Sequence, residues 1–214
     1  MDHMQHVSAH SSRGPLVMAW WFRSRRRFRL VAALAAYAVF ILLLADFDLP
    51  WPGLVQSGSA DVPIVLLLPL AVIAAAGDGL ATGETPIERA STRPVALMDA
   101  LLAFGMAAAA SVIAATLCVT LHFQLSESSA RNLFGLTGLF LLARSLLGSQ
   151  PATAVPATYA AVAMLIGRKQ GDAVEHWAWV ISREAELESW AWAVFLVAAG
   201  LMASFYPIRK PPIA

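Results

Sequence analysis

The sequence predicts an all-α, polytopic membrane protein with six transmembrane helices and both ends in the cytoplasm. Of its 214 residues, 58% are hydrophobic and 14% are charged. The mean hydropathy is +0.65, and these shares lie outside those of ordinary soluble domains. At roughly 20 residues per crossing, the chain has room for about six spans with short connections and no large soluble domain.

Six apolar runs are expected to form the six helices: 29–46, 62–78, 95–122, 131–148, 152–167 and 189–206. Lipid offers no hydrogen-bond partners to the backbone, and these runs lack the alternation of a transmembrane barrel, so helices are favoured. The predicted organisation is a cytoplasmic tail with an interfacial helix over 1–28, a transmembrane domain over 29–207 and a cytoplasmic tail over 208–214.

The distribution of basic residues predicts the orientation. With the N-terminus inside, eleven of the 15 lysines and arginines lie on the cytoplasmic side, many of them in the cluster just before the first run. The other side holds Arg131, Arg168, Lys169 and Arg183. This bias satisfies the positive-inside rule. It predicts a multi-pass protein of a plasma membrane, and we expect a bacterial one.

Two connections between the runs have helical signals of their own. In the cytoplasmic connection 78–94, Thr85 and Glu88 have the spacing of a capping box, and Pro94 ends the short helix. Its charged residues are Glu84, Glu88, Arg89 and Arg93. Such a helix is suited to docking a partner, although an ordinary solvated loop would have the same charges.

The connection 168–189 is expected to form an amphipathic helix at the outer interface, because apolar residues alternate with acidic ones. Tryptophan favours the headgroup region. The residues expected at this interface are Trp177, Trp179 and Trp190. Such a helix either gates an exit route or rests on the lipid headgroups.

Ionisable residues are nearly absent from the predicted spans. Asp99, His122 and Arg144 all lie near span ends, which argues against an ion-driven pump or secondary transporter. Polar residues could line a path through the membrane, although helix packing is their usual role. These candidate pathway residues are Thr116, Thr120, Asn132, Thr137 and Tyr159.

Catalytic and metal-binding motifs are missing from the sequence. It has no Walker-type glycine loop, no His-Glu-x-x-His and no Gly-x-Ser-x-Gly. Its single cysteine, Cys118, excludes an intramolecular disulfide and a multi-cysteine metal site. We therefore expect no catalytic residue, no metal site and no cofactor bound by this chain.

The segment Gly-Glu-Thr-Pro-Ile-Glu-Arg-Ala-Ser-Thr-Arg-Pro-Val-Ala, residues 83–96, resembles the coupling region of the type-2 permease family of ATP-binding-cassette exporters. The membrane domain of that family has an interfacial helix, six spans, a cytoplasmic coupling helix after span two and an outer helical hairpin before span six. The stretch 131–139, with Arg144 beyond it, also resembles small actinobacterial permease-like membrane proteins.

This resemblance implies a membrane subunit of an ATP-driven exporter. Glu84, Glu88, Arg89 and Arg93 would then dock a separate ABC ATPase subunit, which would bind ATP and magnesium and catalyse hydrolysis. The other expected partners are a second permease copy or a related permease and the lipid bilayer, with no nucleic acid. The alternative is a non-transporting membrane protein with an immunity, scaffold or sensor role.

Overall fold

The computed structural model describes residues 27–52, 59–83, 95–121, 125–169, 173–184 and 186–205. Most of these residues are helical, which confirms the all-α character. The α-helices are α2 (Arg27–Leu44), α3 (Leu68–Gly83), α5 (Val95–Leu121), α6 (Ser126–Leu147), α7 (Ser149–Ala152), α8 (Ala154–Ile166) and α9 (Leu187–Phe205). Within the same described ranges there are also two 3-10 helices, η1 (Ile64–Leu66) and η2 (His176–Ile181), and two strands, β1 (Asp48–Pro52) and β2 (Ser59–Pro63).

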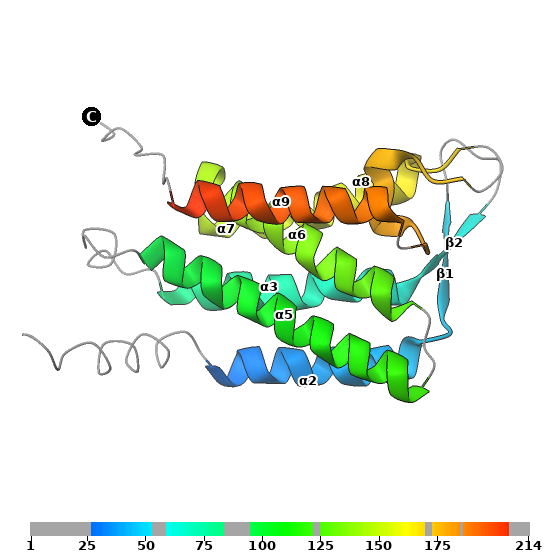
Figure 1. The fold of residues 1–214 in the computed structure, drawn as a ribbon, viewed down its shortest axis with the longest axis horizontal. Coiled ribbons are helices and arrows are strands. Elements are labelled where there is room, and N and C mark those ends of the chain that lie inside the picture. Colours follow the sequence, from blue (N-terminus) through cyan, green and yellow to red (C-terminus); the bar gives the residue numbers. More distant parts are fainter. Residues whose placement is uncertain are drawn as a thin grey trace, which may run out of the picture.

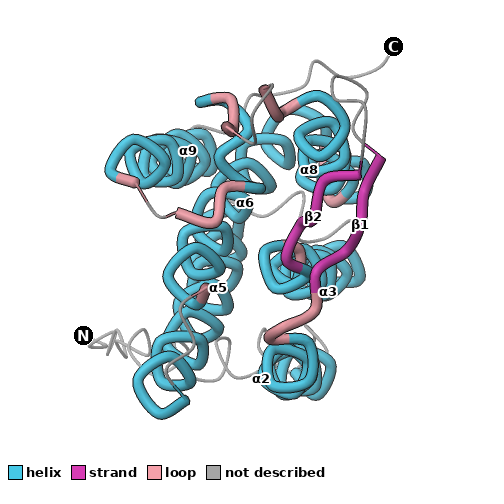
Figure 2. Tube along the Cα trace, turned by 90° about the vertical axis from the view of Figure 1, so that its right-hand side faces the viewer, coloured by secondary structure: helices cyan, strands magenta, loops and turns pink. Residues whose placement is uncertain are grey.

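The long helices run side by side and alternate in direction (Figure 1). One end of this bundle has the two strands and η2, and we name it the hairpin end. At the opposite end α2 begins and α9 ends, and we name it the terminal end. Viewed along the helices, α6 lies between α9 and α8 (Figure 2). Helix α2 lies at the opposite side of the bundle, next to α3 and α5.

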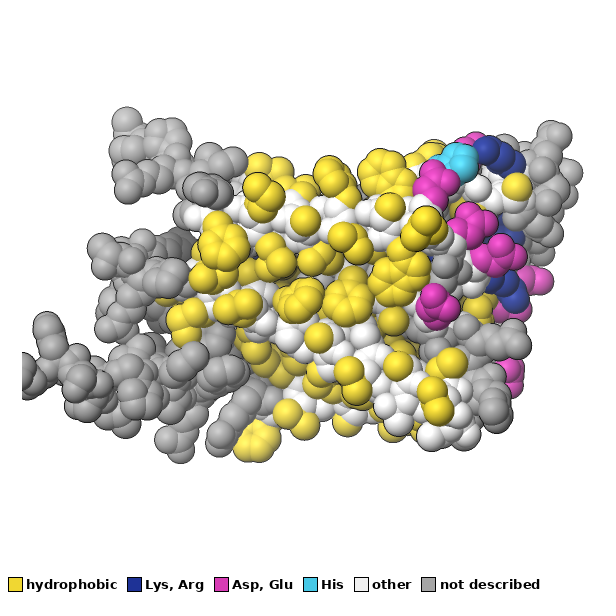
Figure 3. All heavy atoms as spheres, in the orientation of Figure 1, with side chains coloured by type: hydrophobic (Ala, Val, Ile, Leu, Met, Phe, Trp, Pro, Cys, Tyr) yellow, Lys and Arg dark blue, Asp and Glu magenta, His cyan; other side chains and the backbone are white. Residues whose placement is uncertain are grey.

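The sides of the bundle are apolar. Among the residues that the structure describes, three segments are long and apolar enough to cross a membrane: Ile64–Ala81, Val95–Thr120 and Leu187–Phe205. Large hydrophobic side chains are exposed along several helices, among them Leu43 on α2, Val112 and Val119 on α5, and Phe195 and Met202 on α9. Figure 3 shows apolar side chains along the flank and charged ones gathered at the hairpin end. Exposed apolar surface of this extent indicates contact with lipid or protein.

Each of the six predicted apolar runs is mainly helical, with shifted boundaries, and the second run begins in β2 before η1 and α3. The fourth helix begins at Ser126, five residues earlier than predicted. The fifth run is divided between α7 and α8. Three of the helices, α2, α6 and α8, do not belong to the segments long and apolar enough to cross a membrane. In α6 this reflects Arg131, Asn132 and Arg144, which lower its hydropathy.

Helices α6 and α9 approach each other through glycine. A Cβ atom added to Gly138 would overlap the backbone of Leu196 and Val197, and one added to Gly200 would lie 2.5 Å from the carbonyl oxygen of Gly138. Small residues at such crossings let two backbones come close enough for extensive van der Waals contact. These two glycines therefore set the spacing of the two helices.

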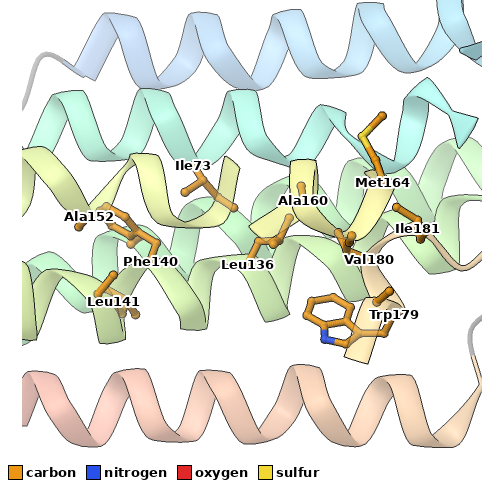
Figure 4. Close-up of a cluster of buried hydrophobic side chains, with 14 of the residues drawn as sticks. Ile73, Leu136, Phe140, Leu141, Ala152, Ala160, Met164, Trp179, Val180 and Ile181 are labelled. Atoms are coloured by element: carbon orange, nitrogen blue, oxygen red, sulfur yellow. The ribbon is translucent and has the colours of Figure 1, made fainter. Parts of the chain in front are cut away.

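The main core joins the second half of the chain to α3 (Figure 4). Leu136 and Phe140 on α6 are buried here together with Met164 on α8 and Trp179 on η2. The indole ring of Trp179 lies against Gly135, where a Cβ atom would overlap it. Because Gly135 has no side chain, it leaves the space in which Trp179 of η2 packs into the bundle.

Between α2 and α3 the structure has an antiparallel hairpin. β1 pairs with β2 so that Leu49 lies opposite Val62 and Trp51 opposite Ala60. Val62 is buried and Leu49 and Trp51 pack on the core, which gives the hairpin an apolar side. The strands contain three prolines, which lack a ladder donor and are tolerated at sheet edges.

The predicted amphipathic helix over 168–189 is replaced by a different structure. Arg168 and Val174 form an isolated bridge, and η2 is a six-residue 3-10 helix. Ala178, Trp179, Val180 and Ile181 are buried, so this segment packs into the end of the bundle. The cause is the four-residue apolar sequence 178–181, which has no polar face for a membrane surface.

Candidate functional site

The residues predicted to dock an ATPase, Glu84, Glu88, Arg89 and Arg93, lie outside the described residues. The helices that flank them are described: α3 ends at Gly83 and α5 begins at Val95, both at the terminal end (Figure 1). The predicted docking segment is therefore connected to the bundle at the end where α2 begins and α9 ends.

The predicted pathway residues do not meet in one cavity. Thr116 and Thr120 are exposed on α5, and their hydroxyls donate to carbonyls of the same helix. Thr137 is buried beside an apolar crevice that is too narrow for a water molecule. Asn132 is buried elsewhere in α6, and the Tyr159 hydroxyl donates to the carbonyl of Trp177. Within the described residues of one chain, these side chains stabilise helices and helix contacts.

The three tryptophans predicted for an outer helix lie on two elements. Trp177 and Trp179 belong to η2, and Trp190 belongs to α9. Trp177 is 38% exposed, whereas Trp179 is only 4% exposed. The ring of Trp179 is buried because it fills the space above Gly135 and packs 5.8 Å from the ring of Tyr159.

At the hairpin end, Arg131 on α6 is completely buried. Its guanidinium donates to the carbonyl oxygens of Trp179 (2.7 Å), Ser182 (3.0 Å) and Glu184 (2.7 Å). It also donates to the Ser189 hydroxyl (3.0 Å) and twice to the Asn132 amide oxygen (3.2 and 3.0 Å). These bonds use all three nitrogens of the guanidinium. The hydrogen-bond requirement of a buried cation is thus met by neutral oxygens.

Asn132 extends this network to the first half of the chain. Its amide nitrogen donates to the carbonyls of Leu66 (3.0 Å) and Val180 (2.7 Å). One turn earlier, the hydroxyls of Ser129 and Tyr37 are hydrogen-bonded at 2.9 Å in a buried position. The start of α6 therefore binds α2, η1, η2 and the segment before α9 together through polar groups.

A cavity of about 750 Å³ lies beside this network at the hairpin end. Its wall comes from β2, the bridge after α8, η2 and the start of α9. A volume of this size is typical of small-molecule sites. The charged side chains that line it are Asp61, Arg168, Lys169, Glu175, Arg183, Glu184, Glu186 and Glu188. Five carboxylates face three permanent cations, and Trp179, Ile181 and Ser189 also contribute to the wall.

An ion pair between a buried carboxylate and a partly buried guanidinium lies near the terminal end. Asp99 on α5 is 1% exposed, and its carboxylate accepts from Arg144 on α6 at 2.6 Å. The same guanidinium donates to the hydroxyl of Ser149 at the start of α7. Desolvation of two charges is costly, so breaking such a pair is strongly destabilising. Asp99 and Arg144 thus hold the start of α5 against α6 and α7.

Sequence reasoning noted Asp99 and Arg144 as residues near span ends but did not pair them. It placed Arg131 among the exposed basic residues that set topology. The sequence signal for a buried role was the position of Arg131 and Asn132 at the start of an otherwise apolar run. Charged residues inside membrane segments usually face the protein interior and bind backbone carbonyls or each other.

Comparisons with protein-family models, curated proteins and solved structures found no match for this chain. The description of the site therefore depends on its own geometry. Among the described residues, no group of three or more His, Cys, Asp or Glu side chains is placed to hold a metal ion.

Proposed function

We propose that the chain crosses a plasma membrane six times, with the terminal end in the cytoplasm and the hairpin end outside. Apolar sides along the bundle and three helices of sufficient length support this arrangement. The orientation is supported by the arginines at 23, 25, 26, 27 and 29, which immediately precede or begin α2. Acidic side chains gather at the opposite end.

In this membrane the protein acts as the membrane subunit of an ATP-driven exporter. A separate ABC ATPase binds the 84–93 segment, holds ATP and magnesium and catalyses hydrolysis. The observation that carries this proposal is the anchoring of the helix that follows the segment. Asp99, on the second turn of α5, is held by Arg144 on α6 at 2.6 Å. Movement of the docking segment is therefore transmitted to the packed helices.

The transport route is formed between two permease units, either two copies of this chain or this chain and a related one. The interior of the described bundle is closed by Leu136, Phe140 and neighbouring apolar side chains. A route along an interface uses outward-facing side chains, and Thr116 and Thr120 are exposed on α5. Oligomers of this kind are usually symmetric.

A test of docking uses the double substitution Glu88→Ala with Arg89→Ala. We expect it to abolish stoichiometric co-purification of an ABC ATPase from the native host in mild detergent, because both charges would face the partner. The matched control is Asp48→Ala with Arg183→Ala, which removes one acid and one base from the hairpin end. This control should retain the ATPase.

The bundle interior is filled by apolar side chains, and this also favours a second candidate function. In that case the chain is a non-transporting membrane protein with an immunity, scaffold or sensor role. Such a protein needs no route through the membrane, and its outer end would be its working surface. Mass spectrometry of the wild-type complex separates the two. Purification of the chain alone, or with a membrane partner other than an ATPase, would replace the exporter proposal with this one.

A further inference from the structure

The cavity at the hairpin end has a charge pattern that selects one class of ligand. Its cations already have partners: Lys169 pairs with Glu175 at 3.1 Å and Arg183 with Asp48 at 2.8 Å. Arg168 donates to the backbone carbonyl of Asp61 at 2.9 Å. An anionic ligand would have to displace these contacts.

Two carboxylates of the wall, those of Asp61 and Glu184, accept no hydrogen bond and form no ion pair with any residue that the structure describes. A third, that of Glu186, likewise has no hydrogen bond or ion pair there, and its charge interacts only with the Arg131 guanidinium behind the wall. Ser189 adds a neutral acceptor. It is 7% exposed, lines the cavity, donates to the carbonyl of Glu186 and accepts from Arg131. A hydroxyl oxygen has two lone pairs, so one remains for a ligand donor. The acceptors that remain available therefore suit a cation with several N–H groups.

The acidic wall is fixed in place by the buried network. The carbonyl of Glu184 accepts from Arg131 at 2.7 Å, and that of Glu186 accepts from Ser189 at 2.7 Å. Because both carbonyls are bound to groups beneath the wall, the backbone that carries the two carboxylates is held in position before a ligand arrives. Such preorganisation lowers the ordering cost of binding.

We propose that this cavity binds a flexible organic polycation with primary ammonium groups, the chemistry shared by polyamines and lysine-rich peptides. A single metal ion fits less well, because no three carboxylate, histidine or cysteine groups of the described residues converge on one point. Several separated carboxylates in about 750 Å³ instead match a ligand with separated charges. This proposal does not depend on the exporter proposal, since it concerns the opposite end of the bundle.

The test is calorimetric titration of the purified full chain in a neutral maltoside detergent with spermidine and, separately, with tri-lysine. We expect saturable binding that weakens as salt is raised, because exposed charges are screened. The variant Glu184→Gln with Glu186→Gln should weaken binding about tenfold or more. It keeps both backbone carbonyls and thus the contacts with Arg131 and Ser189.

The control variant is Asp46→Asn with Glu127→Gln, which removes the same charge from exposed residues outside the cavity wall. It should bind like the wild type. Tighter binding of spermidine would identify a small polyamine as the ligand, and tighter binding of tri-lysine a peptide. Absence of saturable binding, equal loss in both variants, or complete competition by equimolar calcium would overturn the proposal.

Discussion

At the scale of the residue, Arg131 is the most consequential side chain in the described structure. It is fully buried in the first turns of α6 and binds backbone carbonyls on η2 and on the segment that follows. A guanidinium presents five donors in a fixed plane, which an ammonium group does not. One side chain can therefore hold several carbonyls of an irregular segment.

We predict that Arg131→Met lowers the free energy of unfolding by about 3 kcal/mol, because the buried carbonyl of Trp179 and the part-buried bonds to Ser182 and Glu184 lose their donor. Arg131→Lys should also destabilise, since one ammonium cannot reach all of these groups. The measurement is thermal unfolding in detergent. The control is Arg183→Met, which removes an exposed ion pair and should cost less than about 1 kcal/mol. Equal melting temperatures of Arg131→Met and wild type would refute the structural role.

The burial of Arg131 was not predictable from the sequence alone. Four of its six bonds are to acceptors 48 to 58 residues further along the chain, and all six are to backbone, serine or asparagine oxygens that have no charge. A pattern search for acid–base pairs therefore finds no partner for it. Asp99 and Arg144 do have opposite charges, but their 45-residue separation hid the contact.

At the scale of the element, the contact of α6 with α9 requires glycine on both helices. Substitution Gly138→Ala is expected to destabilise the protein by about 1–3 kcal/mol, because the added methyl group overlaps the backbone of α9. The control is Gly105→Ala on α5, where a Cβ atom meets nothing within 4 Å. Thermal unfolding should show a loss for the first variant and little change for the second. The opposite order would mean that the two helices are not packed in this way.

Helices were the most predictable elements, because a run of apolar residues in sequence is enough to specify one in lipid. The hairpin and η2 were missed for a different reason. β1 has two prolines within five residues, which argues against a strand unless the partner strand and the core support it. In η2, the burial of Trp179 depends on the absence of a side chain at Gly135, a feature of another helix.

At the scale of the whole molecule, the proposed six-span arrangement predicts that the two ends of the bundle lie on opposite sides of a membrane. Single cysteines in a Cys118→Ala background test this. An impermeant maleimide should label Asp46→Cys and Glu188→Cys in intact cells, because both positions are exposed at the hairpin end. It should label Gln150→Cys, which is exposed in α7 at the other end, only after permeabilisation. Labelling of all three in intact cells would exclude the six-span arrangement.

At the hairpin end, the two strands are synthesised long before the residues that they contact. Asp48 is bound by Arg183, and the carbonyl of Asp61 is bound by Arg168, so both strands are tied to a part of the chain that the ribosome makes much later. The pair Asp61 and Arg168 is separated by 107 positions. At about 5–20 residues per second, this corresponds to a delay of roughly 5–20 s. During that interval the hairpin has no contact with the 168–183 segment, so its polar groups Asp48 and Asp61 lack the arginine partners that they have in the finished fold.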